Sequence, residues 1–535
     1  MEKNGQISQN LPAPVAASGR HSYEPPTLTE GAARESHPED GRVARVPVER
    51  VGESEARDLY ARRAKLGRIA LLIRTIFNQF IILGGMIVLA RELRPSEFGT
   101  FAMVQFVLSV FTLVGDAGLG GALVQKGEQP SQNELSTVFF AQLGLALFVF
   151  ICASSVAPFL HLFWTDLPSE TPWILRALAA NFIFVSARVV PTLLLEREVL
   201  FVRVAILDTI NSITFYLVAS ILAILGYGTW ALVSGVLAQG ILSFLAAIAL
   251  RPWAPSRFFD WKILRPLLNF GVPYQARAAL SLLTRSSLPV LVGRSVGSHG
   301  VGITTWALET AFFPLTFIDI LGRVNFPLLS RLREDREAFA AELERTLRLG
   351  VAITLFISSL FLGLAEPLTE IIYSAQWLEA VPGLRFFAVG IALGMFPFLL
   401  ASAFDALARP KIVLFQMTAV MVLAWVLSGL GLSYAGIDGF AAGYGLALFA
   451  GTMLIVRPVL KELPRLHMFI PFLTASVAGA AAVGADLVFL RDFARGPLTL
   501  VVSAVCHFII YLVVLALIDK EAIQVLKGAI GRDKK

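Results

Sequence analysis

Long apolar runs that alternate with short polar loops dominate this sequence between Ile69 and Ile518. There are about fourteen runs of roughly 18–25 residues, and a helix that rises about 1.5 Å per residue needs about 20 residues to cross a ~30 Å hydrocarbon layer. Lipid offers the backbone no hydrogen-bond partners, so segments of this kind must be helices. The pattern predicts an all-α polytopic membrane protein with spans over residues 69–90, 100–123, 135–160, 173–195, 204–225, 228–250, 267–292, 301–322, 347–365, 382–407, 411–433, 437–457, 468–490 and 498–518.

The distribution of Lys and Arg predicts how these spans are oriented. Basic residues gather in the loops after even-numbered spans, such as Arg251, Arg257 and Lys262, and they are sparse in the loops after odd-numbered spans. Because short cytoplasmic loops are enriched in Lys and Arg, we expect both termini in the cytoplasm. The excess of 45 Lys and Arg over 39 Asp and Glu lies in these loops. Topology therefore accounts for the basic charge, and no nucleic acid partner is expected.

The composition excludes most catalytic and metal-binding chemistry. The chain has 535 residues, 56% of them hydrophobic, and a mean hydropathy of +0.70. Its two cysteines, Cys152 and Cys506, both lie inside predicted spans, so neither a disulfide framework nor a CxxC metal site is available. The six histidines are scattered, no nucleophile stands beside a base, and no GxxxxGK[ST] motif is present. We expect no enzyme activity, no cofactor and no metal.

Residues 1–60 differ from the rest of the chain because they are polar and repeatedly interrupted by proline. They lack both an apolar core and the hydrophobic region of a signal peptide. We expect a disordered cytoplasmic tail that ends in a basic segment at the membrane surface. A regulatory or partner-docking role for the tail is the alternative. Residues 521–535 are expected to form a second, short cytoplasmic tail.

An internal repeat predicts how the spans are grouped. A shift of 203 residues without gaps superimposes the first span on the seventh and the second on the eighth. It aligns four pairs of residues that are unusual inside or beside membrane spans: Arg74 with Arg277, Arg91 with Arg294, Gly99 with Gly302, and Asp116 with Asp319. We expect an N-terminal lobe over 61–260, a C-terminal lobe over 261–460 and two added helices over 461–520. Two parallel six-helix lobes would enclose a central cavity, an arrangement that suits alternating access.

Polar side chains in the first and seventh spans predict what this cavity binds. Charges within a bilayer are costly and usually face a bundle interior or water. The guanidinium group stays protonated, and its planar fork matches phosphate oxygens. The expected substrate-binding residues therefore lie on one helical stripe in each lobe: Arg74 and Asn78 in the first span, and Arg277, Ser281, Thr284 and Arg285 in the seventh.

Each of these charges also has a structural interpretation. Arg74 lies near the start of its span, where its side chain could reach the inner surface. Arg277 lies deeper, and its alternative is an ion pair with Glu309 or Asp319. Arg285 is close to the outer mouth. The acids are structural partners of arginines or cation-coupling sites, with the structural role favoured: Asp116, Glu309, Asp319 and Asp405.

Several short motifs resemble those of a known transporter family. They are Leu-Arg-Pro-Ser-Glu-Phe-Gly-Thr-Phe at 93–101, Gly-Asp-Ala-Gly-Leu at 115–119, Leu-Glu-Arg-Glu at 195–198 with Phe201, Gly-Thr-Trp-Ala-Leu-Val at 228–233, Gln-Trp-Leu-Glu-Ala at 376–380 and Ala-Arg-Pro-Lys at 408–411. Residues 65–460 as a whole resemble the bacterial polysaccharide and oligosaccharide flippases of the MATE-like multidrug/oligosaccharidyl-lipid/polysaccharide superfamily. The motifs lie at loops and helix ends, so they mark the fold more than the binding site.

The resemblance implies a two-lobed bundle of twelve to fourteen helices in the bacterial inner membrane. It also implies the export of glycans linked to polyprenyl diphosphate for exopolysaccharide, capsule or O-antigen synthesis. The implied partners are this lipid-linked glycan and the bilayer, with a polysaccharide polymerase and glycosyltransferases as further candidates. One departure concerns ion coupling. The family leads us to expect an acid soon after the arginine of the seventh span, where this chain has Ser286 and Ser287.

Three other functions remain open at this stage. A flippase for the peptidoglycan precursor lipid II would also carry a prenyl diphosphate. A MATE-type drug exporter would handle organic cations and should carry an acid in the first span, where this chain has Arg74. A membrane polysaccharide polymerase or ligase should have a large outer loop with catalytic groups. The longest predicted outer loop, 366–381, offers glutamates but neither arginine nor histidine.

Overall fold

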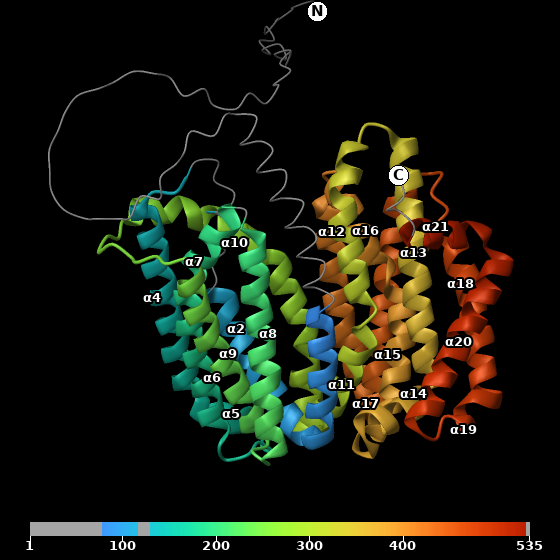
Figure 1. Cartoon of the computed structure of the whole chain (residues 1–535), viewed down its shortest axis with the longest axis horizontal. Helices are drawn as coiled ribbons and strands as arrows, with labels where there is room; N and C mark the ends of the chain where they lie inside the picture. Colours follow the sequence, from blue (N-terminus) through green and yellow to red (C-terminus); the bar gives the residue numbers. More distant parts are fainter. Residues whose placement is uncertain (1–76, 116–122, 124–128, 199, 531–535) are drawn as a thin grey trace, which may run out of the picture. The chain divides into compact units, whose positions relative to one another are not determined.

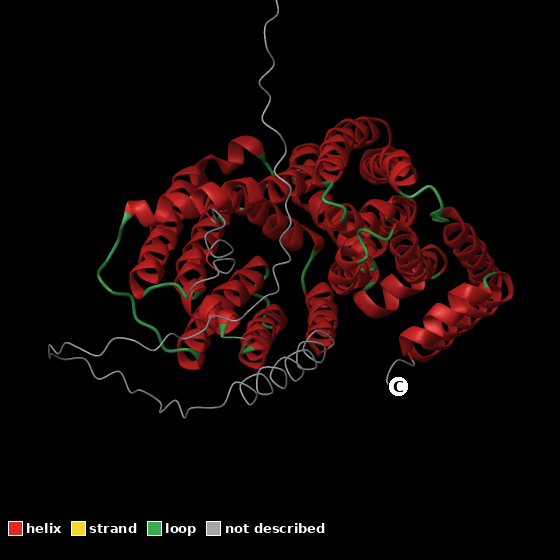
Figure 2. Ribbon diagram, turned by 90° about the horizontal axis from the view of Figure 1, so that it is seen from above, coloured by secondary structure: helices red, strands yellow, loops and turns green. Residues whose placement is uncertain are grey.

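The computed structural model describes residues 77–115, 123, 129–198 and 200–530, all of which belong to one compact unit, Leu59–Lys535. Regular structure in the described residues is entirely helical (Figures 1 and 2). The tail predicted over 1–60, Arg74 and Asp116 lie outside the described residues, so the expectations for them stay predictions.

The first half of the described chain begins with a helical stretch over residues 77–92. The helices that follow are α2 (Pro95–Gly115), α4 (Gln132–Val156), α5 (Leu160–Phe163), α6 (Thr171–Ala187), α7 (Val189–Arg197), α8 (Phe201–Ile224) and α9 (Thr229–Leu250), with a 3-10 turn, η1 (Ala157–Phe159), before α5. Within this half, α8 packs against α9, α4 against α6, and α6 against α9.

The second half holds a larger set of helices. They are α10 (Trp261–Arg285), η2 (Leu288–Val292), α11 (Gly293–Phe312), α12 (Leu315–Arg331), α13 (Arg336–Gly363), α14 (Ala365–Leu368), η3 (Thr369–Tyr373), η4 (Ala375–Ala380), α15 (Val381–Gly394), α16 (Phe396–Ala406), α17 (Pro410–Glu462), α18 (Phe469–Ala485), η5 (Asp486–Leu490), α19 (Arg491–Phe493), α20 (Pro497–Ile518) and α21 (Lys520–Ile530). Here α15 packs against α17 and α12 against α16, while α18 packs against both α13 and α20.

Ten helices among the described residues are long and apolar enough to cross a membrane. An eleventh is added if the pair over 277–331, bent by 42°, is counted as one span. The chain is therefore an all-helical, multi-pass membrane protein, as the apolar runs predicted. Its ten or eleven candidate spans compare with about fourteen predicted from the sequence.

The helix α17 contains a reversal of direction. As one straight helix its 53 residues would measure about 80 Å, more than twice the hydrocarbon thickness. The backbone leaves helical geometry at Ala435 and at Gly436, where φ is +59°. Beyond this point the chain packs against itself, because a Cβ on Gly431 would lie 1.9 Å from the carbonyl oxygen of Gly439. The reversal falls between the two apolar runs predicted at 411–433 and 437–457.

Short polar side chains fix where several helices begin. Ser131 and Glu134 form a capping box at the start of α4, in which the glutamate accepts a hydrogen bond from the Ser131 backbone at 2.8 Å. Asp260 accepts from the backbone of Lys262 at 2.8 Å at the start of α10. Asp335 does the same for the first turn of α13. Each cap satisfies amide groups that a helix end leaves without partners.

The two halves meet where α2 crosses α11. A Cβ on Gly99 would lie 1.7 Å from the carbonyl oxygen of Ser298, and a Cβ on Gly302 would lie 1.8 Å from that of Pro95. Only glycine allows two backbones to approach this closely. The contact is reciprocal, since the 203-residue shift carries Pro95 onto Ser298 and Gly99 onto Gly302. Such self-complementary contacts are typical of a two-fold axis, here between parts of one chain.

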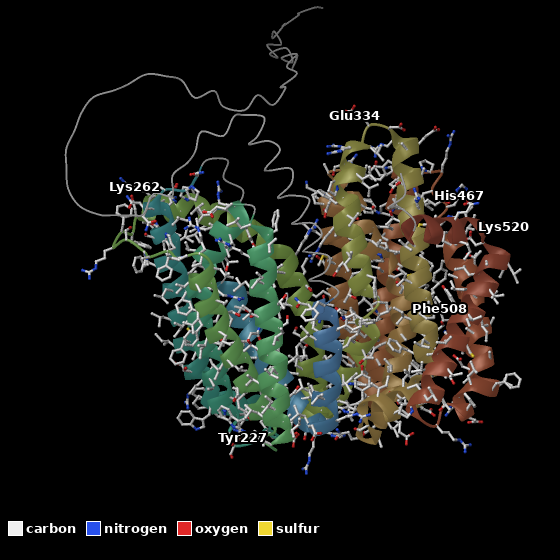
Figure 3. All side chains as sticks on the ribbon, viewed as in Figure 1. Tyr227, Lys262, Glu334, His467, Phe508 and Lys520 are labelled. Carbon is white, nitrogen blue, oxygen red and sulfur yellow. The ribbon has the colours of Figure 1, made fainter. Side chains whose placement is uncertain are left out.

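Loops from the two predicted sides of the membrane lie at opposite ends of the helices. Lys262, Glu334, His467 and Lys520 come from predicted cytoplasmic loops and lie at one end in Figure 3, whereas Tyr227, from a predicted outer loop, lies at the other. We call these the Lys262 end and the Tyr227 end. The crossing of α2 and α11 at Gly99 lies near the beginning of α2, so this contact of the two halves is beside the Tyr227 end.

Candidate functional site

Arg277 on α10 is bound to a carboxylate of the second half. Its two terminal nitrogens lie 2.8 Å and 2.5 Å from the two oxygens of Asp405 on α16, which is the bidentate geometry that guanidinium and carboxylate groups favour. The side chains remain 40% and 28% exposed. Because exposing a charge to hydrocarbon is costly, we expect the pair to face a polar space.

The predicted partner of Arg277 was wrong. The sequence suggested Glu309 or Asp319 for an ion pair, but the observed carboxylate belongs to Asp405, 128 positions away. Glu309 instead binds Arg285, two helical turns further along α10. Asp319 is exposed on α12 and has no ion pair with any described residue. The acid that completes the site therefore comes from α16, which the spacing along α10 and α11 could not reveal.

Arg285 and Glu309 form the second charged pair of this region. The nitrogen–oxygen distance is 2.7 Å, and both side chains are about half exposed. The guanidinium also lies 5.6 Å from the ring centroid of Phe312, within the range of a cation–π contact. Asp405 and Glu309 thus each form an ion pair with an arginine of α10.

The polar residues predicted beside the arginines have different environments. Ser281 is exposed on α10, whereas the Thr284 hydroxyl donates to the Leu280 carbonyl at 2.8 Å. The carbonyl oxygen of the Asn78 side chain is buried, and it has no hydrogen-bond partner among the described residues. No described contact joins Asn78 to the arginines of α10. The part of the chain that the structure describes also holds no group of three side chains fit for a metal ion.

A charged group in the first half escaped the sequence prediction. Arg188 lies between α6 and α7 and interacts electrostatically with Asp208 of α8, which also lies near Glu196 of α7. Close by, the Ser243 hydroxyl donates to the Asn211 side chain at 2.7 Å. Arg188 and Asp208 both fall inside predicted spans. The argument that singled out Arg277, a charge within an apolar run, applied to them equally and could have found them.

A second candidate region is the contact between the halves near the Tyr227 end, which we call the junction. Trp377 of η4 is fully buried, and its ring nitrogen donates to the carbonyl of Ala90 at 2.6 Å. Gln376 donates to the same carbonyl at 2.8 Å. In the opposite direction, Trp164 donates to the carbonyl of Pro289 at 3.1 Å. Each half thus sends a tryptophan to the backbone of the other.

Charged and polar groups surround these tryptophans. Arg91 donates to the carbonyls of Ile371 and Ile372 at 2.5 Å and 2.8 Å. Asp166 accepts from the backbone and the hydroxyl of Ser298, at 2.8 Å and 3.0 Å. The backbone leaves helical geometry at Gly297, where φ is +81°, and the helix begins again at Ser298. The Asp166 carboxylate caps this new beginning, because it accepts from the Ser298 backbone. The junction therefore joins the halves through polar contacts as well as packing.

Three of the motifs noted in the sequence converge here. The side chain of Glu97 accepts from the Arg94 backbone at 2.7 Å, and it also leaves no room for a Cβ on Gly228. The ring of Phe98 packs edge-on against Trp377 at 5.4 Å. The motifs at 93–101, 228–233 and 376–380 thus shape one junction. Beside it lies a cavity of about 320 Å³ bordered by Ser96, Glu97, Thr100, Glu170, Tyr227 and Ser298, among others.

The solved structures that resemble this chain are membrane transporters. A structure titled "Lipid II flippase MurJ, inward closed conformation" matches with a TM-score of 0.71 and 17% identity, covering 85% of this chain and all of that one. An inward-facing MATE multidrug transporter of the MOP superfamily matches with a TM-score of 0.59 and 15% identity, covering 75% of this chain and 99% of that one. At these identities the likeness shows the fold, which is MATE- and MurJ-like.

Sequence relatives and a family model narrow the family. The chain is 26% identical to the succinoglycan biosynthesis transport protein ExoT of Rhizobium meliloti over 56% of its length, and the match spans 61% of ExoT, less than two thirds. It is 22% identical to the lipopolysaccharide biosynthesis protein WzxC of Escherichia coli, over 72% of this chain and 80% of that one. Residues 88–382, more than half of the chain, match the family model described as Polysaccharide biosynthesis protein. The chain belongs to this family of membrane transport proteins.

Proposed function

We propose that this protein is a flippase that moves an oligosaccharide linked to polyprenyl diphosphate across the bacterial inner membrane. The cargo passes from the inner to the outer leaflet and supplies exopolysaccharide, capsule or O-antigen synthesis. No covalent bond is made or broken, so the protein is a transporter and not an enzyme. Glycosyltransferases supply the cargo and a polymerase consumes it.

The arginines of α10 are the observation that carries this proposal. Arg277 lies within a membrane helix, is partly exposed and is held by the carboxylate of Asp405 in a bidentate pair. A diphosphate offers oxygens in the same arrangement as a carboxylate, so it can take the place of Asp405 on the guanidinium fork. Arg285, half exposed beside Glu309, provides a second cation on the same helix.

Further groups complete the proposed site. The exposed Ser281 hydroxyl is available to sugar hydroxyls, and we assign Asn78 to the site on the basis of the sequence. We assign Arg74 to the same site on the basis of the sequence repeat, and Thr284 because it lies on the same helical stripe as Arg277. Asp405 and Glu309 serve as the resting partners of the arginines. For Asp116, which lies outside the described residues, we keep the prediction of a pair with an arginine, with cation coupling as the alternative. Asp319 has no ion pair with a described residue, so cation coupling is the role that we keep for it.

We further propose fourteen membrane crossings with both termini in the cytoplasm. We count two crossings in the two arms of α17 and two in the stretch over 277–331, whose backbone leaves helical geometry at Gly297. We assign the stretch over 77–92 to the first crossing. The lobes keep the predicted bounds 61–260 and 261–460, with 461–520 added to the second. Reporter fusions after Asp166 and Glu370 should be external and those after Arg257 and Arg336 internal; the reverse at two of these positions would refute the orientation.

The junction defines the conformational state in this proposal. Its tryptophan, arginine and aspartate contacts hold the halves together at the Tyr227 end. A protein closed at this end accepts cargo from the Lys262 end, which we assign to the cytoplasm. Opening the junction while the Lys262 end closes would release the cargo outward.

The test is the fate of the lipid-linked glycan in cells that lack this protein. We expect polyprenyl-diphosphate glycan to accumulate in the inner leaflet and one surface or secreted polysaccharide to be lost. Accumulation of lipid II would instead indicate a peptidoglycan flippase, and increased drug sensitivity with normal polysaccharide would indicate a multidrug exporter. Either of these outcomes would overturn the proposal.

A further inference from the structure

The last described helix, α21, runs across the end of the bundle and not along it. In Figure 2 it is the helix that ends beside the C label, and it is seen from its side, whereas most of the long helices are seen nearly end-on. It follows the membrane helix α20 directly, because the backbone turns at Asp519, where φ is −128° and ψ is 88°. Lys520, its first residue, lies at the Lys262 end (Figure 3). The helix therefore begins at the level where the apolar span of α20 stops.

One arginine fixes how α21 is placed on the bundle. Arg348 of α13 is only 8% exposed. Its guanidinium lies 2.9 Å and 2.8 Å from the two oxygens of Asp519 and 2.7 Å from an oxygen of Glu521. Asp519 also accepts from the Ala522 backbone at 2.9 Å, so it caps the first turn of α21. Because Glu521 is held on Arg348, the helix is also fixed in rotation about its own axis.

The sequence of α21 places apolar and charged residues on different sides of the helix. With 3.6 residues per turn, one continuous sector is apolar. Its members are Ala522, Ile523, Val525, Leu526, Ala529 and Ile530. Glu521 lies at one border of this sector, which the ion pair with Arg348 turns toward α13. Lys520 and Lys527, two turns apart, lie at the opposite border. The acidic border thus faces the protein, and the basic border lies on the other side of the apolar sector.

The bundle covers only part of the apolar sector. α21 packs against α13 and α20, and Ala522 is buried in this contact. Ile523 and Val525 are partly buried, and Lys520 is exposed, with no ion pair to a described residue. The sequence over 520–535 holds five cations, Lys520, Lys527, Arg532, Lys534 and Lys535, against two acids, of which Glu521 is already bound. The side away from α13 is therefore apolar with a basic border.

We propose that α21 binds the surface of the bilayer through anionic phospholipids of the leaflet at the Lys262 end. A helix that follows a membrane span directly and lies across its end meets lipid headgroups wherever protein does not cover it. Basic residues bordering an apolar sector fit this environment, because the ammonium groups bind phosphates while the apolar side chains enter the acyl boundary. Arg348 sets the rotation of α21 that turns this border outward. The proposal goes beyond transport and does not depend on the cargo.

The first experiment measures which lipid the full chain retains. Protein purified in detergent is mixed with equal amounts of phosphatidylglycerol and phosphatidylcholine, and bound lipids are counted by native mass spectrometry. We expect the parent to prefer phosphatidylglycerol, and the double variant Lys520→Gln with Lys527→Gln to reduce this preference at least fivefold. The matched control is Lys411→Gln with Lys461→Gln, which removes two exposed lysines from the ends of α17. Equal preferences in the two double variants, or no preference in the parent, would overturn the proposal.

The second experiment measures where α21 lies in a bilayer. A spin label is attached at Ile523→Cys, or at Gln524→Cys on the polar side, in full-length protein without Cys152 and Cys506. In nanodiscs that contain phosphatidylglycerol, we expect the label at 523 to collide mainly with oxygen, which dissolves in lipid, and the label at 524 with a water-soluble nickel chelate. Nanodiscs of phosphatidylcholine alone should weaken this contrast. A label at 523 that the chelate reaches freely would leave the helix in water or free for another protein, and one that neither reagent reaches would place Ile523 against the bundle. Either result would overturn the proposal.

Discussion

At the scale of single residues, the functional proposal rests on Arg277. Arg277→Ala should reduce export per inserted molecule at least tenfold, because the diphosphate loses its bidentate partner. Arg277→Lys should recover only part of the activity, since a point charge cannot reproduce the fork. The measurement is surface polysaccharide normalised to membrane-inserted protein. Arg265→Ala, an exposed arginine earlier on the same helix, is the control and should export normally.

The partner of Arg277 distinguishes a substrate site from a structural ion pair. If the pair with Asp405 only stabilises the fold, Arg277→Ala leaves an unpaired carboxylate, and Arg277→Ala combined with Asp405→Ala should restore both abundance and export. If Arg277 binds cargo, the double variant should recover abundance and remain inactive. Normal export by the double variant would therefore refute the substrate role.

The buried tryptophans of the junction allow a comparison of hydrogen-bonded and free indoles. Trp377→Phe removes the hydrogen bond to the Ala90 carbonyl and should weaken the closed junction by about 1 kcal/mol. Trp306 stacks on Trp377 with the ring centroids 5.3 Å apart, but its ring nitrogen has no hydrogen-bond partner among the described residues. Trp306→Phe therefore removes similar ring area without a hydrogen bond.

Cysteine labelling measures this effect. In a background without Cys152 and Cys506, the variant Ser281→Cys is exposed to a membrane-impermeant reagent added on the outside. We expect the cysteine at position 281 to react roughly fivefold faster in the Trp377→Phe protein than in the protein with both tryptophans, the factor that about 1 kcal/mol implies. In the Trp306→Phe protein it should react more slowly than in the Trp377→Phe protein. The same rate for both variants would show that the hydrogen bond does not hold the junction closed.

At the scale of helices, apolar runs predicted the elements well and their partners poorly. The runs at 411–433 and 437–457 anticipated the two arms of α17, because each is long enough to cross the bilayer. Hydropathy carries no information on which helices touch, so it could not pair Arg277 with Asp405. Nor could it place the break at Gly297, which depends on a side chain, Asp166, from the other half.

The repeat aligned two glycines that the structure brings together, although the sequence did not predict that they touch. It aligned Gly99 with Gly302, and these residues form the crossing of α2 and α11. Gly99→Ala should sharply lower the abundance or thermal stability of the purified protein, since its Cβ would overlap the Ser298 carbonyl. Gly144→Ala on α4 is the control, because nothing lies within 4 Å of its Cβ. A fully stable Gly99→Ala protein would contradict this backbone contact.

At the scale of the whole molecule, alternating access requires the junction to open in every cycle. Asp166 and Ser298 lie on opposite sides of the junction, 3.0 Å apart at their side-chain oxygens. A disulfide between Asp166→Cys and Ser298→Cys, in a background without the native cysteines, should hold the junction closed. We expect oxidation to stop export and a reductant to restore it, with disulfide formation followed by gel mobility.

The control for this disulfide comes from within the first half. The hydroxyls of Ser136 and Ser256 lie 2.9 Å apart, and both residues precede α10. A disulfide between Ser136→Cys and Ser256→Cys joins parts that move together in a two-lobed transporter, so it should leave export intact. Export that continues at full rate with the Asp166–Ser298 positions cross-linked would mean that cargo crosses without opening the junction. Loss of export in both cross-linked proteins would mean that motion inside the first half is required. That result would contradict the assumption that each lobe moves as a rigid body.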